Sequence, residues 1–193
     1  MFAHILGNSN KTMANKSPIY QFKITLKGIR PPIWRRFQVK SAITFRQLHE
    51  IIQTVMGWYN YHLYNFDVGF ENFTDTETAA EFGSKNAARH KIDRYIRHEG
   101  QKALYEYDFG DSWEHELLLE KIVSAEPGVH YPRCLKGKRN CPPEDCGGPW
   151  GYAEMLEALA DPEHPEFEMY QEWLGEDFDP EEFSVEDINE MLQ

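Results

Sequence analysis

The stretch Ile19-Tyr-Gln-Phe-Lys-Ile-Thr-Leu-Lys27 alternates apolar and polar residues over its whole length. A period of two is typical of a strand that buries one face and exposes the other. Gly28 ends the pattern, and Pro31-Pro32 belongs in a connection because proline has no N–H to give to a sheet. The strand pattern resumes from Ile33 to Val39. We expect the two strands to pair as a hairpin.

The next segment has the signals of an amphipathic helix. Thr44 is followed three residues later by Gln47, which is the spacing of a capping box. Apolar residues then recur at helical intervals as far as Gly57, a residue that commonly ends helices; they are Phe45, Leu48, Ile51, Ile52, Val55 and Met56. The sequence therefore predicts a helix that follows the first hairpin.

Further strands and helices are expected along the rest of the chain. Strand patterns cover His62–Val68, Leu104–Phe109 and Trp113–Val123, and Gly110-Asp111-Ser112 joins the last two as a turn. We interpret residues 71–91 as a polar loop, followed by a short helix at 92–96. Helical stripes at 150–160, at 167–174 and from Ser184 onward predict a helical C-terminal part that packs its aromatic residues inward.

This order of elements is typical of an α+β protein with a mixed β-sheet. A hairpin followed by a helix that crosses the sheet indicates a β-grasp-like (ubiquitin-like) arrangement of the N-terminal part. We expect residues 1–18 to be a disordered tail and residues 19–193 to form a single domain. Within that domain we distinguish a sheet-rich part (19–130), a Cys/Pro/Gly-rich loop (131–152) and an acidic helical part (153–193).

The loop contains all three cysteines of the chain: Tyr131-Pro-Arg-Cys134-Leu-Lys-Gly-Lys-Arg-Asn-Cys141-Pro-Pro-Glu-Asp-Cys146-Gly-Gly-Pro-Trp-Gly-Tyr152. Three thiolates could bind a structural zinc ion if a fourth ligand joined them. The candidates for that ligand are His115, His130 and Asp145. The alternative is that the three cysteines are reduced and buried as small apolar residues. An odd, clustered set of cysteines argues against a secreted disulfide framework and favours the cytoplasm.

Charge divides the chain into two unequal parts. Residues 1–66 contain nine Lys/Arg and one acid, whereas fifteen acids and no Lys or Arg follow from Tyr152 to the end. Arg30, Arg35 and Arg36 around Trp34 form a basic and aromatic patch that could contact phosphates or an acidic peptide. We expect the C-terminal helices to cover and neutralise this patch, so that binding to duplex DNA is weak.

A second candidate site lies at the turn of the second hairpin. Asp108, Asp111, Glu114 and His115 crowd there, and this density of carboxylates could bind a hard cation or support acid/base chemistry. The alternative is an ordinary polar turn, in which Asp111 takes a turn position and His115 is a hydrogen-bonded core histidine.

Four stretches together resemble the plasmid pRiA4b ORF-3-like family; they are Leu26–Arg36, Leu48–Gln53 with Met56–Trp58, Tyr105–His115 and Cys141–Tyr152. The resemblance runs from about Ile19 to the C-terminus. It implies little about activity, although some members carry labels as resolvase-type passenger proteins of mobile elements.

The chemistry of a recombinase site is missing from the sequence. A serine resolvase needs a nucleophilic serine set among arginines, yet Ser9 and Ser17 precede the first arginine, Arg30. The spacing His130-Tyr-Pro-Arg133 is the one hint of a tyrosine recombinase, and it lies in a proline-containing loop. The resolvase label therefore finds no support in the residues themselves.

Two hypotheses about function remain. The first is a non-catalytic binding or adaptor module for an unknown protein or nucleic-acid partner, and the second is a metal-dependent hydrolytic enzyme or an accessory factor in DNA transactions. We favour the first because no nucleophile, base and orienting group can be assembled from the sequence. No membrane partner is expected, since the chain has no apolar run of about eighteen residues.

Overall fold

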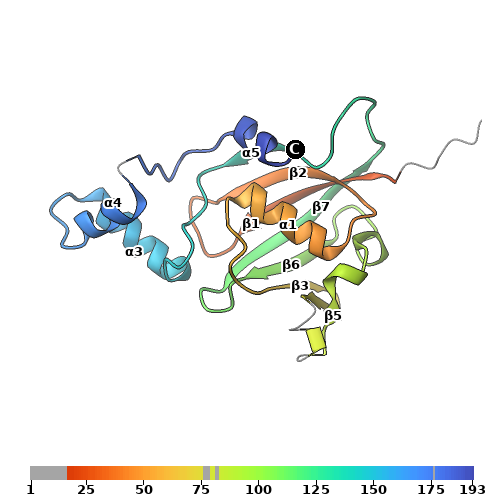
Figure 1. Ribbon diagram of the computed structural model, residues 1–193, viewed down its shortest axis with the longest axis horizontal. Coiled ribbons are helices and arrows are strands. Elements are labelled where there is room, and N and C mark those ends of the chain that lie inside the picture. The colour runs from red at the N-terminus through yellow and green to blue at the C-terminus, as the bar shows by residue number, and fades with distance from the viewer. Residues whose placement is uncertain (1–16, 76–78, 81–82, 176) are drawn as a thin grey trace, which may run out of the picture.

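The structure is a computed structural model that describes residues 17–75, 79–80, 83–175 and 177–193. The tail expected to be disordered therefore lies, up to residue 16, outside the described residues. Eight strands form one sheet in the order β5-β4-β3-β6-β7-β1-β2-β8 (Figure 1). The strands are β1 (Ile19–Leu26), β2 (Trp34–Lys40), β3 (Tyr64–Val68), β4 (Glu71–Thr74), β5 (Lys85–Asn86), β6 (Lys102–Tyr107), β7 (Trp113–Val123) and β8 (Arg133–Lys138).

The sheet is mixed, because β4 and β5 pair in parallel while the other neighbours are antiparallel. The predicted hairpins β1–β2 and β6–β7 both form, and β7 pairs with β1 to join them. The α+β class with a mixed sheet is thereby confirmed. The β-grasp-like arrangement is not confirmed by this strand order, and the extent of a single domain over 19–193 stays a prediction.

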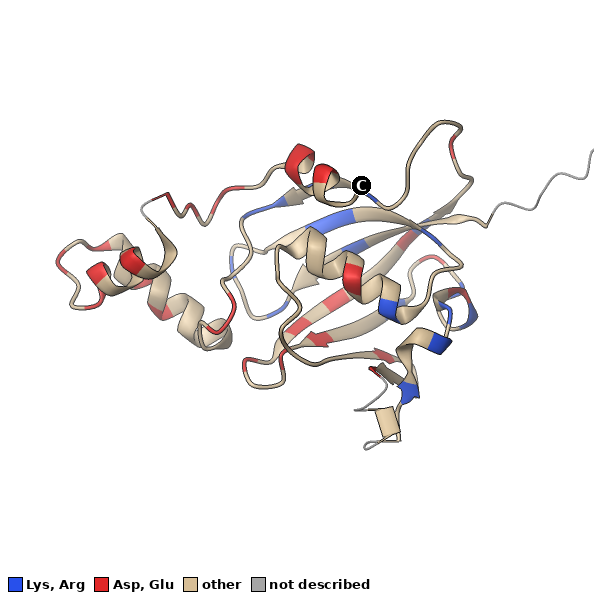
Figure 2. Cartoon of the chain, in the orientation of Figure 1, with Lys and Arg blue, Asp and Glu red and all other residues tan. Residues whose placement is uncertain are grey.

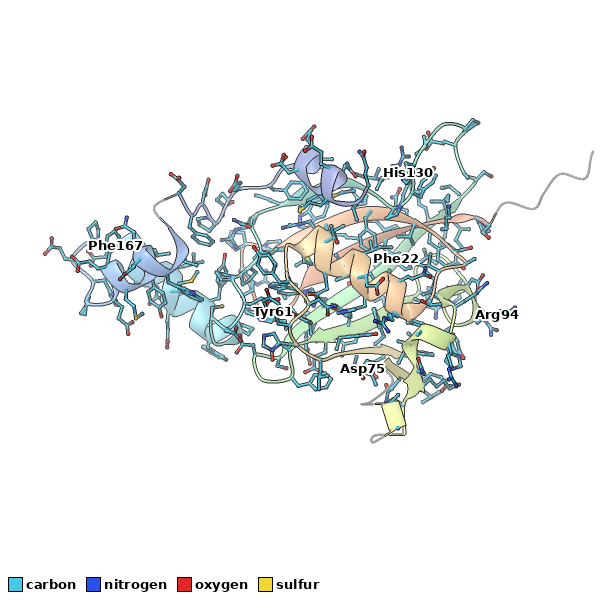
Figure 3. The ribbon with its side chains drawn as sticks, in the orientation of Figure 1. Phe22, Tyr61, Asp75, Arg94, His130 and Phe167 are labelled. Atoms are coloured by element: carbon cyan, nitrogen blue, oxygen red, sulfur yellow. The ribbon has the colours of Figure 1, made fainter. Side chains whose placement is uncertain are left out.

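Helix α1 (Phe45–Met56) lies across one face of the sheet (Figure 1). Its capping box is the predicted one: Thr44 Oγ1 accepts from the Gln47 N–H, and the Gln47 side chain accepts from the Thr44 N–H. Gly57 ends the helix in a left-handed conformation. The buried face of α1 contacts the sheet through Phe45, which packs on Phe66 of β3 and Phe73 of β4, and through His49, which lies beside Tyr105 of β6. Phe22 of β1 belongs to the same buried core (Figure 3). The opposite face of the sheet carries mainly polar side chains.

Two segments expected to be loops contain strands. In residues 71–91, β4, β5 and a short 3₁₀ helix (Ala87–Arg89) form because β4 pairs with β3 and buries Phe73, whose ring stacks on Phe45 at 4.0 Å between centroids. A second 3₁₀ turn follows at Ile92–Arg94, where a short helix was expected. In residues 131–152, β8 pairs with β2 at the sheet edge.

The C-terminal helices are α3 (Gly148–Ala160), α4 (Phe167–Leu174) and α5 (Val185–Met191). Figure 1 shows α3 and α4 extending away from the sheet, while α5 returns to the β8 edge. The prediction that these helices bury their aromatic residues is wrong for α4, which has no buried residue, and for Trp150, which is 84% exposed. The cause is that α3 and α4 pack mainly on each other. No helix in the described part of the chain is long and apolar enough to cross a membrane.

Candidate functional site

Three segments that are distant in sequence meet at one end of the sheet, next to the start of α3. They are residues 59–63, residues 107–111 and residues 144–148, and we call this region the acidic corner. Main-chain groups hold it together: the Tyr59 N–H donates to Glu144 Oε1 at 3.0 Å, and the Asp108 N–H donates to the Leu63 carbonyl at 2.8 Å. Two of the three segments belong to the motifs Tyr105–His115 and Cys141–Tyr152, so these motifs converge in space.

Tyr107 and Glu144 form the central polar contact of the acidic corner. The Tyr107 hydroxyl donates to Glu144 Oε1 at 2.7 Å and accepts from the Tyr61 N–H at 3.0 Å. Burial, together with the Glu144 carboxylate, raises the pKa of Tyr107, so the phenol stays protonated. The second Glu144 oxygen, Oε2, is shielded from solvent and has no hydrogen-bond partner among the described residues.

A buried histidine supports the corner from below. His49 on α1 stacks on Tyr64 at 3.6 Å between ring centroids and lies 2.8 Å from the Tyr105 hydroxyl through Nδ1. Its Nε2 lies 2.6 Å from Asn60 Oδ1, a carbonyl that accepts, so Nε2 carries the proton. Burial lowers the pKa of His49 to about 4, because desolvation disfavours the charged imidazolium. His49 is therefore a neutral structural histidine.

One group of three metal-ligating side chains lies in the corner. Within the described residues, His62, Asp108 and Asp145 are the one set whose ligand atoms all lie within 4.8 Å of one another. His62 Nε2 is 3.2 Å from Asp145 Oδ1 and 3.7 Å from Asp108 Oδ2. Asp108 is buried at 8% exposure, whereas the Asp145 side chain is 70% exposed, so the group opens to solvent on one side.

Asp111 has a structural role beside this group. Its Oδ2 accepts from the Gly147 N–H at 3.1 Å, at the N-terminus of α3, where a negative charge is favoured by the helix dipole. Gly148, with φ of +69°, lies so close that a Cβ there would be 2.4 Å from the Asp111 carbonyl oxygen. The Gly-Gly of the motif thus allows α3 to begin directly against the turn of the second hairpin.

Exposed aromatic side chains flank the acidic groups. Tyr59 and Tyr61 are 74% and 75% exposed, and their rings are stacked with centroids 5.9 Å apart. Leu63 and Phe109 add further exposed apolar area at 47% and 43%. Figure 3 shows Tyr61 on the side of the sheet that faces α3. The main chain that carries these side chains is fixed by the hydrogen bonds described above, so the patch is presented on a rigid frame.

The cysteines occupy apolar surroundings. Cys134 and Cys141 are buried in the core, Cys146 is partly buried, and all three are free thiols. Burial raises the pKa of each thiol, that of Cys146 to about 12, so the metal-free fold keeps them protonated. These sulfurs do not form a set within 4.8 Å with each other or with a fourth ligand among the described residues. Zinc binding by the cysteines is therefore not confirmed.

The two histidines proposed as fourth ligands lie in different settings. His115 is fully buried, its Nδ1 lies 3.3 Å from the Tyr105 carbonyl oxygen, and burial lowers its pKa to about 3. Its Nε2 has no hydrogen-bond partner among the described residues. His130 is exposed in the connection between β7 and β8 (Figure 3). The surroundings of His115 are those of a buried core histidine, which was the alternative to a metal ligand.

The structure splits the basic patch. Arg35 is buried on the helix-covered face, where it donates to the carbonyls of Trp34, Val55 and Lys138. Arg36 lies on the opposite face beside the Trp34 ring, and Arg30 is exposed in the β1–β2 connection. Both faces of β2 are used, as expected for consecutive residues of a strand.

The expected covering of this patch by the C-terminal helices is wrong in its main part. Arg36 makes two hydrogen bonds to Glu120 on β7, at 2.6 and 2.8 Å, and Lys27 pairs with Glu114, also on β7. Neutralisation comes from the neighbouring strand because β7 lies directly beside β1 in the sheet. Figure 2 shows acidic residues of α3 and α4 well away from the hairpin. The C-terminal part contributes Phe183, over which the Arg35 guanidinium lies.

Comparison with known proteins places the chain in a family. Residues 18–187 match the family described as plasmid pRiA4b ORF-3-like protein. The chain belongs to this family. An uncharacterized protein, y4hQ, of Sinorhizobium fredii (strain NBRC 101917 / NGR234) is 40% identical over 179 residues, which are 90% of each chain. The crystal structure of a protein of unknown function, MM3350 from Methanosarcina mazei Go1, is similar with a TM-score of 0.81 and 43% identity, covering 88% of this chain and 97% of that one.

Sequence reasoning found part of the corner and missed part of it. Asp108 was expected at a candidate cation site, and Asp145 was considered as a zinc ligand. His62 was not singled out, because a lone histidine at the start of a strand has no distinguishing pattern. Its role in the group becomes visible when β3 is placed beside the turn that follows β6.

Proposed function

We propose that this pRiA4b ORF-3-like protein is a non-catalytic, cytoplasmic binding module, and that the acidic corner is its binding surface. The observation that carries this proposal is the stacked, exposed pair of Tyr59 and Tyr61 on a main chain fixed by hydrogen bonds. Exposed aromatic groups on a rigid frame lose little conformational entropy when a partner covers them, and they are common centres of binding energy.

The partner that fits this surface is a protein segment rich in Lys and Arg. Tyrosine rings attract cations through their faces, and the carboxylates of Glu144 and Asp145 lie beside them. The same charges repel phosphates, so duplex DNA is a poor partner for this face. The free, reduced cysteines favour the cytoplasm, where thiols stay reduced.

A displayed library of random peptides, panned against the immobilised full chain, tests this proposal. We expect enrichment of basic peptides, and we expect each of them to bind the double variant Tyr59→Ala/Tyr61→Ala at least about ten-fold more weakly. Phe70→Ala is the matched control, because Phe70 is a fully exposed aromatic residue between β3 and β4, outside the acidic corner. Enriched peptides that are acidic, or that bind the double variant as well as the parent, would overturn the proposal.

A further inference from the structure

The buried carboxylate of Asp108 has no Lys or Arg partner among the described residues. Asp108 is 8% exposed, and within the described chain its one ion-pair partner is His62, which is charged only when protonated. Oδ1 accepts from the Gly110 N–H at 2.9 Å, which leaves Oδ2 directed at His62. A buried carboxylate without a compensating charge is costly. The surrounding acids Asp111, Glu144 and Asp145 add to the negative potential.

The histidine that faces this carboxylate is also incompletely paired. His62 Nε2 is shielded from solvent, and it makes no hydrogen bond of good geometry with the described residues although two carboxylates lie close to it. The imidazole nitrogen and one oxygen of each carboxylate are three ligand atoms that all lie within 4.8 Å of one another. A cation bound between them would satisfy all three groups.

The distances suit one small ion. Zinc binds histidine nitrogen and carboxylate oxygen at about 2.0–2.2 Å, so two ligands at a tetrahedral angle lie about 3.4 Å apart. The observed separations from His62 Nε2 are 3.2 Å to Asp145 Oδ1 and 3.7 Å to Asp108 Oδ2. No rearrangement larger than a few tenths of an ångström is needed to bring these two pairs to that separation.

We propose that His62, Asp108 and Asp145 bind a divalent cation of the zinc class. The imidazole nitrogen favours zinc over magnesium and calcium, which prefer oxygen ligands alone. Three protein ligands leave a fourth position open, and the 70% exposure of the Asp145 side chain places that position toward solvent. This site is separate from the cysteines, and its argument does not rest on the proposed peptide surface.

Calorimetric titration of the chelator-treated full chain with zinc chloride tests the site. We expect one ion per chain, and a loss of affinity of at least about ten-fold in Asp108→Asn and in Asp145→Asn. Asparagine tolerates the left-handed backbone of both positions, where φ is 56° and 60°, so the fold is retained. Asp145→Asn is the safer of the two variants, because the Asp145 side chain is exposed and its replacement does not disturb the core. Asp67→Asn on β3 is the matched control and should bind as the parent does.

The absorption spectrum of the chain loaded with cobalt in place of zinc distinguishes this site from the cysteines. Cobalt bound by nitrogen and oxygen donors lacks the intense near-ultraviolet charge-transfer band of cobalt thiolates, so we expect no such band in the parent. Zinc binding that survives in both asparagine variants but is lost in Cys146→Ser would overturn the proposal, as would the absence of saturable binding. Peptide binding measured in chelator reports on the proposed function alone, so failure of one proposal is distinguishable from failure of the other.

Discussion

Residues 133–141 and residues 142–152 are consecutive segments of the chain, which we call the first half and the second half. The polar groups of the first half are hydrogen-bonded, whereas several polar groups near the second half are not. In the first half, the Asn189 side chain bonds both the N–H and the carbonyl of Cys134, at 2.7 and 3.0 Å. Arg139, which is 4% exposed, bonds Glu181 and the Pro31 carbonyl. This half is fastened to the C-terminal segment and serves the fold.

The Arg35 side chain on β2 joins the first half to the core through the Lys138 carbonyl. Its guanidinium donates to three carbonyls and lies 4.6 Å from the centroid of the Phe183 ring. Phe183 in turn lies against Gly137 on β8, where a Cβ would be 2.5 Å from the ring. The Asn189 contacts also cover part of β8, which is an edge strand and would otherwise expose unpaired main-chain groups.

The second half leads into the acidic corner, where Glu144 Oε2 and His62 Nε2 have no hydrogen-bond partner among the described residues. Local rules that a fold obeys elsewhere are commonly broken at functional sites. We infer from this difference that residues 133–141 stabilise the fold, whereas residues 142–152 help to form a ligand-binding site.

The largest effect is expected from acid, because neutral histidines lie beneath the corner. The pKa values of His49 and His115 are lowered to about 4 and about 3, so each takes up a proton only on unfolding once the pH falls below the usual value near 6.5. The free energy of unfolding should fall by about 1.4 kcal/mol per pH unit for each histidine, or roughly 3–4 kcal/mol between pH 7 and pH 5.

Urea unfolding at several pH values measures this dependence. In His115→Leu, which replaces the histidine by an apolar residue, the slope of stability against pH should fall to about half. A slope in that variant equal to the parent's would show that His115 is not the neutral core histidine described here.

A slightly smaller effect is expected from a methyl group at Gly151. Its Cβ would lie 1.9 Å from the Cys146 carbonyl oxygen, so α3 and the corner would have to separate. We expect Gly151→Ala to lower the free energy of unfolding by about 3 kcal/mol. The control is Gly128→Ala, where nothing lies within 4 Å and the cost of the φ of +78° is about 1 kcal/mol. Equal losses for the two variants would argue against close packing in the second half.

Asn189→Ala tests the first half and should cost about 2 kcal/mol. The variant leaves the N–H and the carbonyl of Cys134 without their side-chain partner, and Cys134 is buried. Asn189→Asp keeps an acceptor for the N–H but loses the donor to the carbonyl, so it should also be less stable than the parent. Zinc binding should be unchanged in Asn189→Ala. A loss of zinc binding in this variant would contradict the assignment of a purely structural role to the first half.

Sequence patterns predicted the elements that depend on interactions between residues close together in the chain. The capping box of Thr44 and Gln47 is a local signal for the start of α1, because both partners lie within four residues of each other. The alternation of β1 and β7 predicted strands because one face of each is buried. Strand β8 was taken for a loop since Lys136, Gly137 and Lys138 have no such alternation, and its pairing with β2 depends on contacts distant in sequence.

The site could be predicted only in fragments for the same reason. Asp108 was noted as part of the polar turn and Asp145 as a candidate zinc ligand, but their convergence with His62 requires the strand order β3-β6-β7 and the close start of α3. The cysteines attracted attention as a cluster in sequence, while the structure buries Cys134 and Cys141 in the core and leaves Cys146 partly buried against it. Spacing in sequence was therefore a poor guide to which side chains meet.

The central claim is that the acidic corner is arranged for a ligand rather than for stability. The most direct test is the free energy of unfolding of Asp108→Asn in chelator at pH 8. Asparagine keeps the bond from the Gly110 N–H and removes the uncompensated charge, so the account predicts a stability equal to the parent's or higher by up to about 1 kcal/mol. A loss as large as that of Asn189→Ala would contradict it.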